Sequence, residues 1–359
     1  MPSGEVGYLV TRHEDARTVL ADPAFSLAAL WRPGGPRFAP GPRPSVGFSL
    51  AALDPPEHTR VRGLVSRAFT VRRVEALRPV IQAIADELLD RIARDGPPAD
   101  LVAGLCAPLP ITVICQVLGV PPGAREDFRG WSDAITAADP AAPERWRDAW
   151  HELGGYLVRL IAAKRETPAD DLLSMLIATL GEQSADFELA TLAVQLIIAG
   201  NETTLNQLGA VIHVLLREPE TYAALCAEPG LAGPAVEELL RLHPPNDAML
   251  RAATRDVRIG DTLIPAGSGV LVDPAAANRD PSAFADPDRL DLRRGAGAGH
   301  LTFGYAAHFC LGAALARAQL LIAVTGLTRR FPGLRAAAGP ADVPGSTSEH
   351  AVRALPVTW

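Results

Sequence analysis

The sequence predicts a mainly helical protein with a minor β component, and three observations lead to that fold class. Apolar residues recur at helical spacing over long stretches, strand-like runs are few and short, and 31 glycines and 32 prolines are scattered through 359 residues without a regular period. A hydrophobic content of 48% lets a chain of this length bury a large core. No internal repeat or long linker divides the sequence, so we expect a single domain over residues 1–359.

Composition also excludes several functional classes. A net charge of −7 argues against a nucleic-acid-binding protein that depends on bulk positive charge. The first residues lack a cationic segment followed by an apolar one, and no apolar stretch is long enough to span a bilayer. We therefore expect a cytoplasmic protein that does not enter a membrane. The four cysteines contain no C-x-x-C pair, which fits neither a disulfide framework nor a structural zinc site.

The first elements are expected to be a short strand and three helices. Residues 8–11 have the pattern of a strand, and residues 13–20 that of a helix. Asp54 can cap the next helix, because prolines occupy its first turn and Glu57 follows three residues later. Core-facing apolar residues predict the third helix over residues 74–92.

The middle of the chain is expected to be helical and the last third mixed. Helical patterns cover residues 108–118, 125–164 with proline breaks, 188–216, 233–242 and 313–329. Short strands occupy residues 250–272, and residues 277–299 are irregular. The helix over 188–216 is apolar nearly all round in its first half, as in a helix that crosses a core. Polar residues 200–204 interrupt it where burial is unfavourable, so they need a functional reason.

Cys310 is the thiol whose neighbours set it apart. Gly304 and Gly312 bracket it, His308 lies two residues before it, and a helix begins directly after it. The positive end of a helix dipole lowers a thiol's pKa and suits the thiolate to bind a metal. Phe303 could shield the sulfur from water. The competing interpretation is a small buried apolar residue, which is the common role of a lone cysteine.

The segment 303–312 reads FGYAAHFCLG and resembles the haem-binding loop of the cytochrome P450 family, F-G-x-G-x-H-x-C-x-G. The resemblance implies the cytochrome P450 fold, haem b as cofactor, and Cys310 as the ligand of its iron. The other loop residues implied to surround the cofactor are Phe303, Gly304 and Gly312. The family's second glycine is Ala306 here, which strains the loop if that position requires a positive φ.

A second motif lies in the long helix. Residues 199–204 read AGNETT and resemble the family's oxygen-activating motif, A-G-x-[DE]-T. By this resemblance Thr203 would hold a hydrogen bond and Glu202 would feed protons, while small Ala199 would leave room beside the haem. A loosened helix at this point would admit dioxygen and water. The alternative is a helix kink with solvated polar residues.

Glu238 and Arg241 lie three residues apart on one predicted helix, so their side chains can pair. An exposed salt bridge of little consequence is one interpretation. The pair also resembles the family's E-x-x-R motif, and Pro287-Asp288-Arg289 resembles the segment that supplies a third member, Arg289. The resemblance implies a structural network that fixes the irregular segment and the cysteine loop.

His58 and Arg62 lie four residues apart on one helix and can point the same way. Haem carries two propionates, which need cationic or hydrogen-bonding partners when they are buried. The residues that the resemblance assigns to them are His58, Arg62, Arg251 and His308. Four further arginines form either a solvated basic face or a docking surface for an acidic electron donor: Arg60, Arg67, Arg72 and Arg73.

The resemblance implies a haem-thiolate monooxygenase that inserts one oxygen atom of O2 into an apolar small molecule, by hydroxylation or epoxidation in secondary metabolism. Electrons from NAD(P)H would arrive through a ferredoxin reductase and a ferredoxin, because the sequence carries no flavin or iron–sulfur motif. The residues expected to line the substrate pocket are Leu196, Asn246, Met249 and Leu250. The alternatives are a peroxide-driven enzyme, which Glu202 and Thr203 disfavour, and a catalytically silent homologue that binds haem or another ligand.

The resemblance extends from Leu9 to the C-terminal Leu355-Pro356-Val357, in the family's order of motifs. Soluble family members usually carry another helix and a first strand ahead of that point. Either the start codon is assigned too late, or the protein is a shortened variant whose cytochrome P450 fold lacks the first helix and strand. In the second case we expect one sheet edge and part of the substrate channel to be more exposed.

Overall fold

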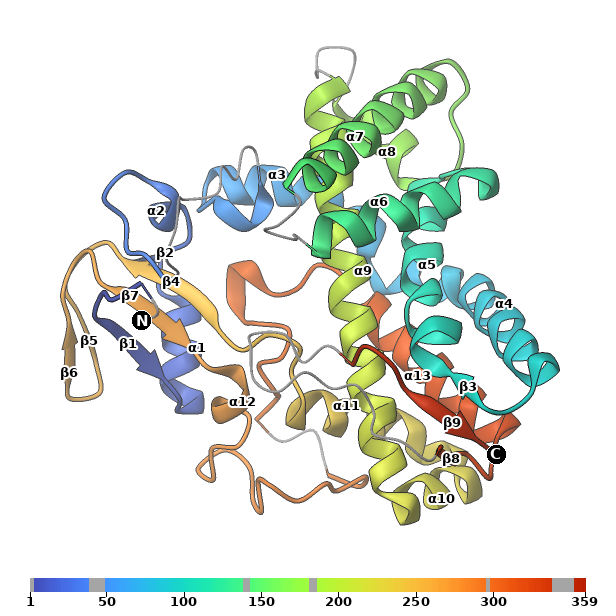
Figure 1. Ribbon diagram of the computed structural model, residues 1–359. Coiled ribbons are helices and arrows are strands. Elements are labelled where there is room, and N and C mark those ends of the chain that lie inside the picture. Colours follow the sequence, from blue (N-terminus) through green and yellow to red (C-terminus); the bar gives the residue numbers. More distant parts are fainter. Residues whose placement is uncertain (1–2, 39–48, 138–142, 181–185, 295–297, 338–351) are drawn as a thin grey trace. The chain divides into compact units, whose positions relative to one another are not determined.

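The computed structural model describes residues 3–38, 49–137, 143–180, 186–294, 298–337 and 352–359. Most of these residues are helical and the strands are short, so the predicted fold class is confirmed. The described residues form two compact units, and Figure 1 labels their helices and strands. The first unit contains residues 3–63 and 233–313, and the second contains residues 64–232, 314–337 and 352–359. That the whole chain forms one domain stays a prediction.

A four-stranded sheet organises the first unit. In spatial order its strands are β1 (Gly7–Val10), β7 (Gly269–Val272), β4 (Met249–Ala253) and β2 (Phe25–Ser26). β1 runs parallel to β7, and the other pairs are antiparallel. The separate hairpin consists of β5 (Val257–Ile259) and β6 (Thr262–Ile264). Helix α1 (His13–Ala21) contributes Ala16 and Val19 to the apolar core of the sheet, where β7 contributes Val270.

Four further helices belong wholly or mostly to this unit. They are α2 (Ala28–Trp31), α3 (Glu57–Ser66), α11 (Ala232–Leu242) and α12 (Pro274–Ala277). The sequence predicts that the Asp54 side chain caps α3, and the structure shows that it does not. Its carboxylate instead accepts hydrogen bonds from the Leu27 backbone N–H, at 3.0 Å, and from the Ser26 hydroxyl, at the entrance to α2. The two prolines that follow Asp54 keep it outside α3, which begins only at Glu57.

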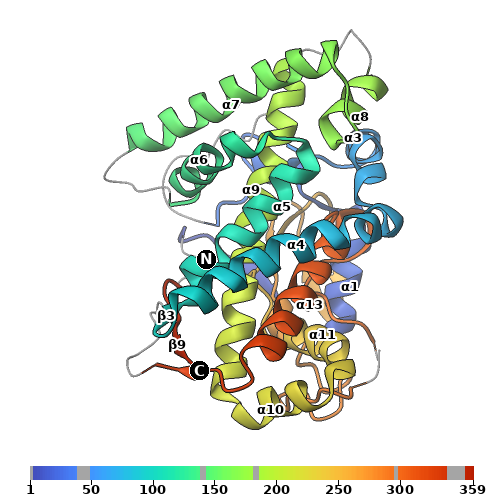
Figure 2. The same cartoon turned by 90° about the vertical axis from the view of Figure 1, so that its right-hand side faces the viewer.

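Helices dominate the second unit. They are α4 (Val71–Asp95), α5 (Pro108–Leu118), α6 (Arg125–Ala137), α7 (Pro143–Glu166), α8 (Leu172–Leu180), α9 (Asp186–Arg217), α10 (Pro219–Ala227) and α13 (Ala313–Arg330). The strands β3 (Ala99–Asp100), β9 (Pro356–Thr358) and β8 (Arg335–Ala336) form a small sheet in that order. α9 packs against α5, α6 and α7, and Figure 2 shows these helices around it. The predicted helix over 188–216 is therefore confirmed, and it continues without a break through residues 200–204.

α13, which follows the cysteine loop, is fixed to α4. Arg330 pairs with Asp86 at 2.9 Å and also with Asp90. The helices approach closely at Gly326, where an added Cβ would lie 2.6 Å from Leu89 Cδ1. None of the helices in the described ranges combines the length and the apolar character needed to cross a bilayer.

Candidate active site

The loop of residues 303–312 folds back on itself and presents Cys310. The Cys310 backbone N–H donates to the Phe303 carbonyl at 2.7 Å, and the Phe309 N–H donates to the Ala306 carbonyl at 3.1 Å. Cys310 is exposed, whereas Cys106 and Cys115 are buried. The interpretation of Cys310 as a small buried apolar residue is therefore wrong. The loop holds its sulfur three residues before α13 begins.

Ala306 occupies the left-handed region of backbone conformation, with a φ of 55°. The position does require a positive φ, which glycine adopts at no steric cost. For a residue with a Cβ this conformation is less favourable by about 1 kcal/mol. Gly304 also has a positive φ, of 73°, and an added Cβ there would lie 3.4 Å from the His308 carbonyl oxygen. The chain thus keeps glycine at the crowded position and tolerates alanine at the exposed one.

Four cationic or titratable side chains of the first unit gather beside this loop. The rings of His58 and His308 lie 4.0 Å apart between centroids, and the Arg62 guanidinium donates to the Phe309 carbonyl at 2.6 Å. His58 and Arg251 are 2% and 5% exposed. Burial lowers the pKa of Arg251 to about 10. Burial, together with the positive charges of its neighbours, lowers the pKa of His308 to about 4.

This cation cluster lacks matching negative charge. Asp54 is the one carboxylate that favours the charged forms of His58, Arg251 and His308 within the described residues. The Nδ1 atom of His58 is buried and has no hydrogen-bond partner among the described groups. A buried set of donors with surplus positive charge fits an anionic ligand that carries carboxylates.

Glu238 and Arg241 form a buried ion pair at the end of α11, not an exposed one. The guanidinium donates to both carboxylate oxygens at 2.8 Å, and the two side chains are 3% and 2% exposed. Burial raises the pKa of Glu238, but the hydrogen bonds from Arg241 and Arg294 outweigh burial and leave it below its usual value. The Arg241 guanidinium also donates to the Pro287 carbonyl at 2.7 Å, which ties the irregular segment to the helix.

The third cation of this network is Arg294, so the prediction that named Arg289 is wrong. Arg294 Nε donates to Glu238 at 2.9 Å. The Arg289 side chain is exposed, and its residue contributes its backbone carbonyl, which accepts from Arg241 at 3.4 Å and from Arg294 at 3.2 Å. The turn at Asp286, whose φ is 45°, is followed by a second turn that brings Arg294 back to the carboxylate.

The polar residues of α9 belong to the second unit. The Thr203 hydroxyl donates to the Ala199 carbonyl at 2.7 Å, one helical turn earlier. Glu202 is half-buried, and Leu196 lies on the same helix. The buried Asn201 amide donates to the Ser132 hydroxyl of α6 at 2.9 Å, while its Oδ1 has no partner in the described part of the chain.

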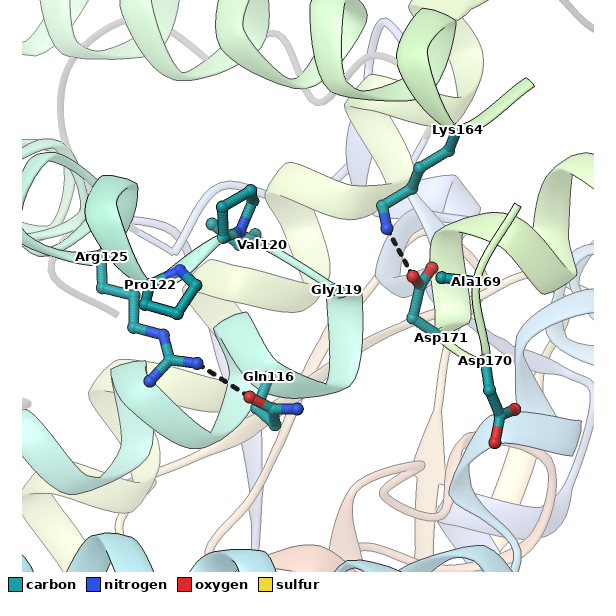
Figure 3. Close-up of a pocket in the computed structure, with 10 residues that line it drawn as sticks. Gln116, Gly119, Val120, Pro122, Arg125, Lys164, Ala169, Asp170 and Asp171 are labelled. Atoms are coloured by element: carbon teal, nitrogen blue, oxygen red, sulfur yellow. Dashed lines mark hydrogen bonds and ion pairs between the residues drawn. The ribbon is translucent and has the colours of Figure 1, made fainter. Parts of the chain in front are cut away.

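A pocket of about 400 Å³ opens in the second unit (Figure 3). Of its charged lining groups, Lys164 pairs with Asp171 and Asp170 with Arg73, whereas Arg125 donates to the neutral amide of Gln116 at 2.8 Å and its Nε has no partner among the described residues. None of the residues predicted for the substrate or the cofactor lines this pocket, so we assign it no part in the site.

Comparisons with known proteins decide the family. The family model for Cytochrome P450 matches residues 231–334, which include the buried ion pair and the cysteine loop. Nocardicin C N-oxygenase of Nocardia uniformis subsp. tsuyamanensis is 44% identical, with 100% of this chain and 91% of that protein covered. The chain belongs to the cytochrome P450 family. PikC, a cytochrome P450 monooxygenase of Streptomyces venezuelae, is 42% identical over 100% of this chain and 86% of its own length.

Solved structures agree with this assignment. The mixed-function P450 MycG in complex with mycinamicin IV is 39% identical and superposes with a TM-score of 0.92, covering 100% of this chain and 92% of that one. The LnmA cytochrome P450 hydroxylase of Streptomyces atroolivaceus S-140 gives a TM-score of 0.91 at 40% identity, with the same coverage. The protein therefore has the cytochrome P450 fold and is a monooxygenase, which is an oxidoreductase.

A cytochrome P450 uses haem and receives electrons from redox partners, and the donor set of the first unit fits that cofactor. In the described ranges no three His, Cys, Asp or Glu side chains converge as a metal site. A porphyrin supplies the remaining ligands of an iron that one cysteine binds. The cluster offers the guanidiniums of Arg62 and Arg251 and the unpartnered His58 Nδ1 to the propionates, against the single carboxylate of Asp54.

The predicted substrate residues come from both units. Met249 and Leu250 begin β4, and Asn246 is exposed just before it. The Met249 side chain packs on the core of the sheet, with its sulfur 3.8 Å from the point where a Cβ on Gly304 would lie. Leu196 lies on α9 in the other unit, so the joint pocket stays a prediction. Sequence reasoning missed Arg294, since no periodicity marks which arginine of an irregular segment turns inward.

Proposed function

We propose that this cytochrome P450 inserts one oxygen atom of O2 into an apolar small molecule, by hydroxylation or epoxidation in secondary metabolism. The observation that carries the proposal is the exposed Cys310 held beside a buried, under-neutralised cation cluster in one unit. The relatives support the substrate class. Their names include a nocardicin C N-oxygenase and a mycinamicin IV hydroxylase/epoxidase, both of which oxidise small molecules.

In this proposal the first unit holds haem b. Cys310 supplies the thiolate ligand, and the residues that face the propionates are His58, Arg62, Arg251 and His308. His58 contributes its unpartnered buried Nδ1, and Arg251 a guanidinium that otherwise donates to the carbonyl of its neighbour Leu250 at 2.8 Å. The bound haem supplies the activation of dioxygen for transfer of one oxygen atom. Phe303, Gly304 and Gly312 shape the loop that carries the thiolate.

Thr203 and Glu202 handle protons in the second unit. The Thr203 hydroxyl donates its hydrogen to the Ala199 carbonyl, so the lone pairs of Oγ1 remain available as acceptors. Such an oxygen can accept a hydrogen bond from a protonated oxygen group or from water, and the Glu202 carboxylate can take up and release the proton. Ala199 and Gly200 carry no side chain larger than a methyl group, and Ile114 lies 3.6 Å from the point where a Cβ on Gly200 would lie.

Electrons from NAD(P)H reach the protein through a ferredoxin reductase and an acidic ferredoxin. The structure narrows the proposed basic docking face, because Arg73 pairs with Asp170 and Arg60 with Glu57. Arg72, in the first turn of α4, and Arg67, in the short turn before that helix, remain exposed and carry the attraction. Arg72→Glu should slow reduction by an acidic ferredoxin at low salt, and Arg91→Glu, farther along α4, should not. Equal rates for both variants would contradict the docking site.

The experiment that tests the assignment is the absorption spectrum of the reduced protein with carbon monoxide. Thiolate-ligated haem gives a strongly red-shifted Soret band, and we expect this band for the protein and for Cys226→Ser. Cys310→Ser should lose it. A protein without this band is not a haem-thiolate enzyme. If the band is present but NADPH, reductase and ferredoxin yield no oxidised product with any bound small molecule, the protein is a silent homologue.

A further inference from the structure

Asn278 is a fully buried amide immediately after α12, with an exposure of 0%. Its Nδ2 donates to the Arg241 carbonyl and to the Thr302 hydroxyl oxygen, each at 3.0 Å. Its Oδ1 accepts from the Leu301 backbone N–H at 2.7 Å. The side chain therefore uses both amide hydrogens and its oxygen, and the partners lie on two segments that are far apart in the sequence.

These two segments are the end of α11 and the entrance to the cysteine loop. On the α11 side, the Arg241 guanidinium donates to the Asn278 backbone carbonyl at 2.8 Å. On the loop side, the Thr302 hydroxyl donates to the Leu240 carbonyl at 2.7 Å. Arg241 is the partner of Glu238. Asn278 thus connects the buried ion pair to the loop, beside the direct bond from Thr302 to α11.

The loop depends on this connection at its first peptide groups. Asn278 holds the Leu301 N–H, and the Leu301 carbonyl accepts from the Gly304 N–H at 2.8 Å. The direction in which the chain leaves Leu301 then sets the path to Cys310. The strained φ of 55° at Ala306 persists only if contacts around the loop hold the backbone in place. The hydrogen bonds that fix the loop entrance at Leu301 and Thr302 are such contacts.

We propose that Asn278 is a positioning residue for the Cys310 thiolate, an inference that rests on the proposed haem-thiolate function. No other side chain of this size meets the requirement. Aspartate has the same shape but puts an acceptor 3.0 Å from the Arg241 carbonyl, where a donor is needed. An apolar residue leaves the buried Arg241 carbonyl and Leu301 N–H unpaired, whereas the Thr302 hydroxyl keeps its bond to Leu240. Glutamine is one carbon too long for the closely packed site.

The test replaces the amide with a carboxylate of the same shape, Asn278→Asp, in the haem-loaded protein. The matched control is Gln207→Glu, the same change at a buried amide of α9, 2% exposed and in the other unit. Two quantities are measured: hydrogen exchange at the Leu301 and Cys310 amides, and the share of the reduced carbon monoxide complex that shows the thiolate band. We expect Asn278→Asp to speed exchange about tenfold and to lower the thiolate share. Gln207→Glu should change neither.

A milder variant keeps the inference decidable if Asn278→Asp does not accumulate. Thr302→Val retains the shape but removes the hydroxyl oxygen that accepts from Asn278. It should move both readouts in the same direction by a smaller factor. Wild-type exchange at Leu301 and Cys310 with an unchanged thiolate share, in either variant, overturns the inference. If the wild-type protein itself lacks the thiolate band, the proposed function fails, and the exchange rates still decide whether Asn278 fixes the loop.

Discussion

The loop of residues 303–312 and the polar segment of α9, residues 199–204, each carry a family motif, but they are held in different ways. The loop is fixed by side chains far away in the sequence, such as Arg62, which is 247 residues from the carbonyl it binds. In the α9 segment, the Thr203 hydroxyl binds the carbonyl four residues earlier, although the Asn201 amide also donates to Ser132 of α6. The helical backbone of this segment follows from local bonds, whereas the shape of the loop depends on the network around it.

The ion-pair network that supports the loop and the polar groups of α9 also differ in how completely they are paired. Glu238, Arg241 and Asn278 have partners for their charged or amide groups. On α9, the Asn201 oxygen and both polar atoms of Gln207 lack partners in the described part of the chain. A fully paired network gives rigid support to the loop that carries Cys310, the proposed ligand of iron. Unpaired polar atoms can bind water, which suits the proton handling proposed for α9.

The strongest test of the loop's dependence is Glu238→Ala. It leaves the Arg241 guanidinium, 2% exposed, without its carboxylate, and we expect the free energy of unfolding to fall by about 3–5 kcal/mol. Little haem-loaded protein should be recovered. Glu237→Ala is the control, because that side chain is 45% exposed and should change the free energy by less than about 0.5 kcal/mol. Urea unfolding measures both, and similar losses would mean that the pair does not support the loop.

The second test separates the two candidate third cations. Arg294→Met removes a hydrogen bond to Glu238 and hydrogen bonds to three backbone carbonyls. We therefore expect the free energy of unfolding to fall by about 2 kcal/mol. Arg289→Met removes an exposed side chain while its carbonyl stays in place, and should change the free energy by less than about 0.5 kcal/mol. The reverse order in urea unfolding would restore the interpretation drawn from the sequence.

The smaller effect of Ala306→Gly sharpens the comparison, because it removes strain that the α9 segment does not have. With φ at 55°, glycine should raise the free energy of unfolding by about 1 kcal/mol, less the entropy that glycine adds to the unfolded chain. Haem loading should rise with it. Ala307→Gly, next to it, gains no relief and should be neutral or destabilising by about 0.5–1 kcal/mol. Thermal unfolding of the two variants distinguishes relief of strain from a general effect of glycine.

The same contrast explains what the sequence could predict. Helices whose signals are local were predicted well: α5 has the expected bounds, and α9 extends two residues earlier and one residue later than expected. The motif residues around Cys310 and Thr203 could be named because their spacing is local too. Asn278 could not, because its partners lie 23 to 37 residues away. The sequence pattern places Asp54 at the start of the helix that follows it, although its carboxylate accepts from a side-chain hydroxyl and two backbone N–H groups 26 to 28 residues earlier.

Thr203→Val should have the smallest effect on stability and a specific effect on chemistry. The hydroxyl's bond to Ala199 lies within the helix, so its loss should change the free energy of unfolding by about 0.5 kcal/mol or less. In turnover with electron donors, the variant should release more hydrogen peroxide per NADPH consumed and form less product. Thr204→Val, at the buried neighbouring position, should keep the wild-type ratio.

The comparison of Thr203→Val with Thr204→Val decides whether the loop and the α9 segment differ in function as well as in the contacts that hold them. If Thr203 acts through its oxygen, Thr203→Val changes how electrons divide between product and peroxide while the thiolate band and haem content stay as in the wild type. A variant of the network that supports the loop, such as Arg294→Met, should do the opposite and lose haem content, with an unchanged ratio in the molecules that retain it. An unaltered ratio in Thr203→Val would remove Thr203 from proton delivery and leave its hydroxyl as a local bond of α9.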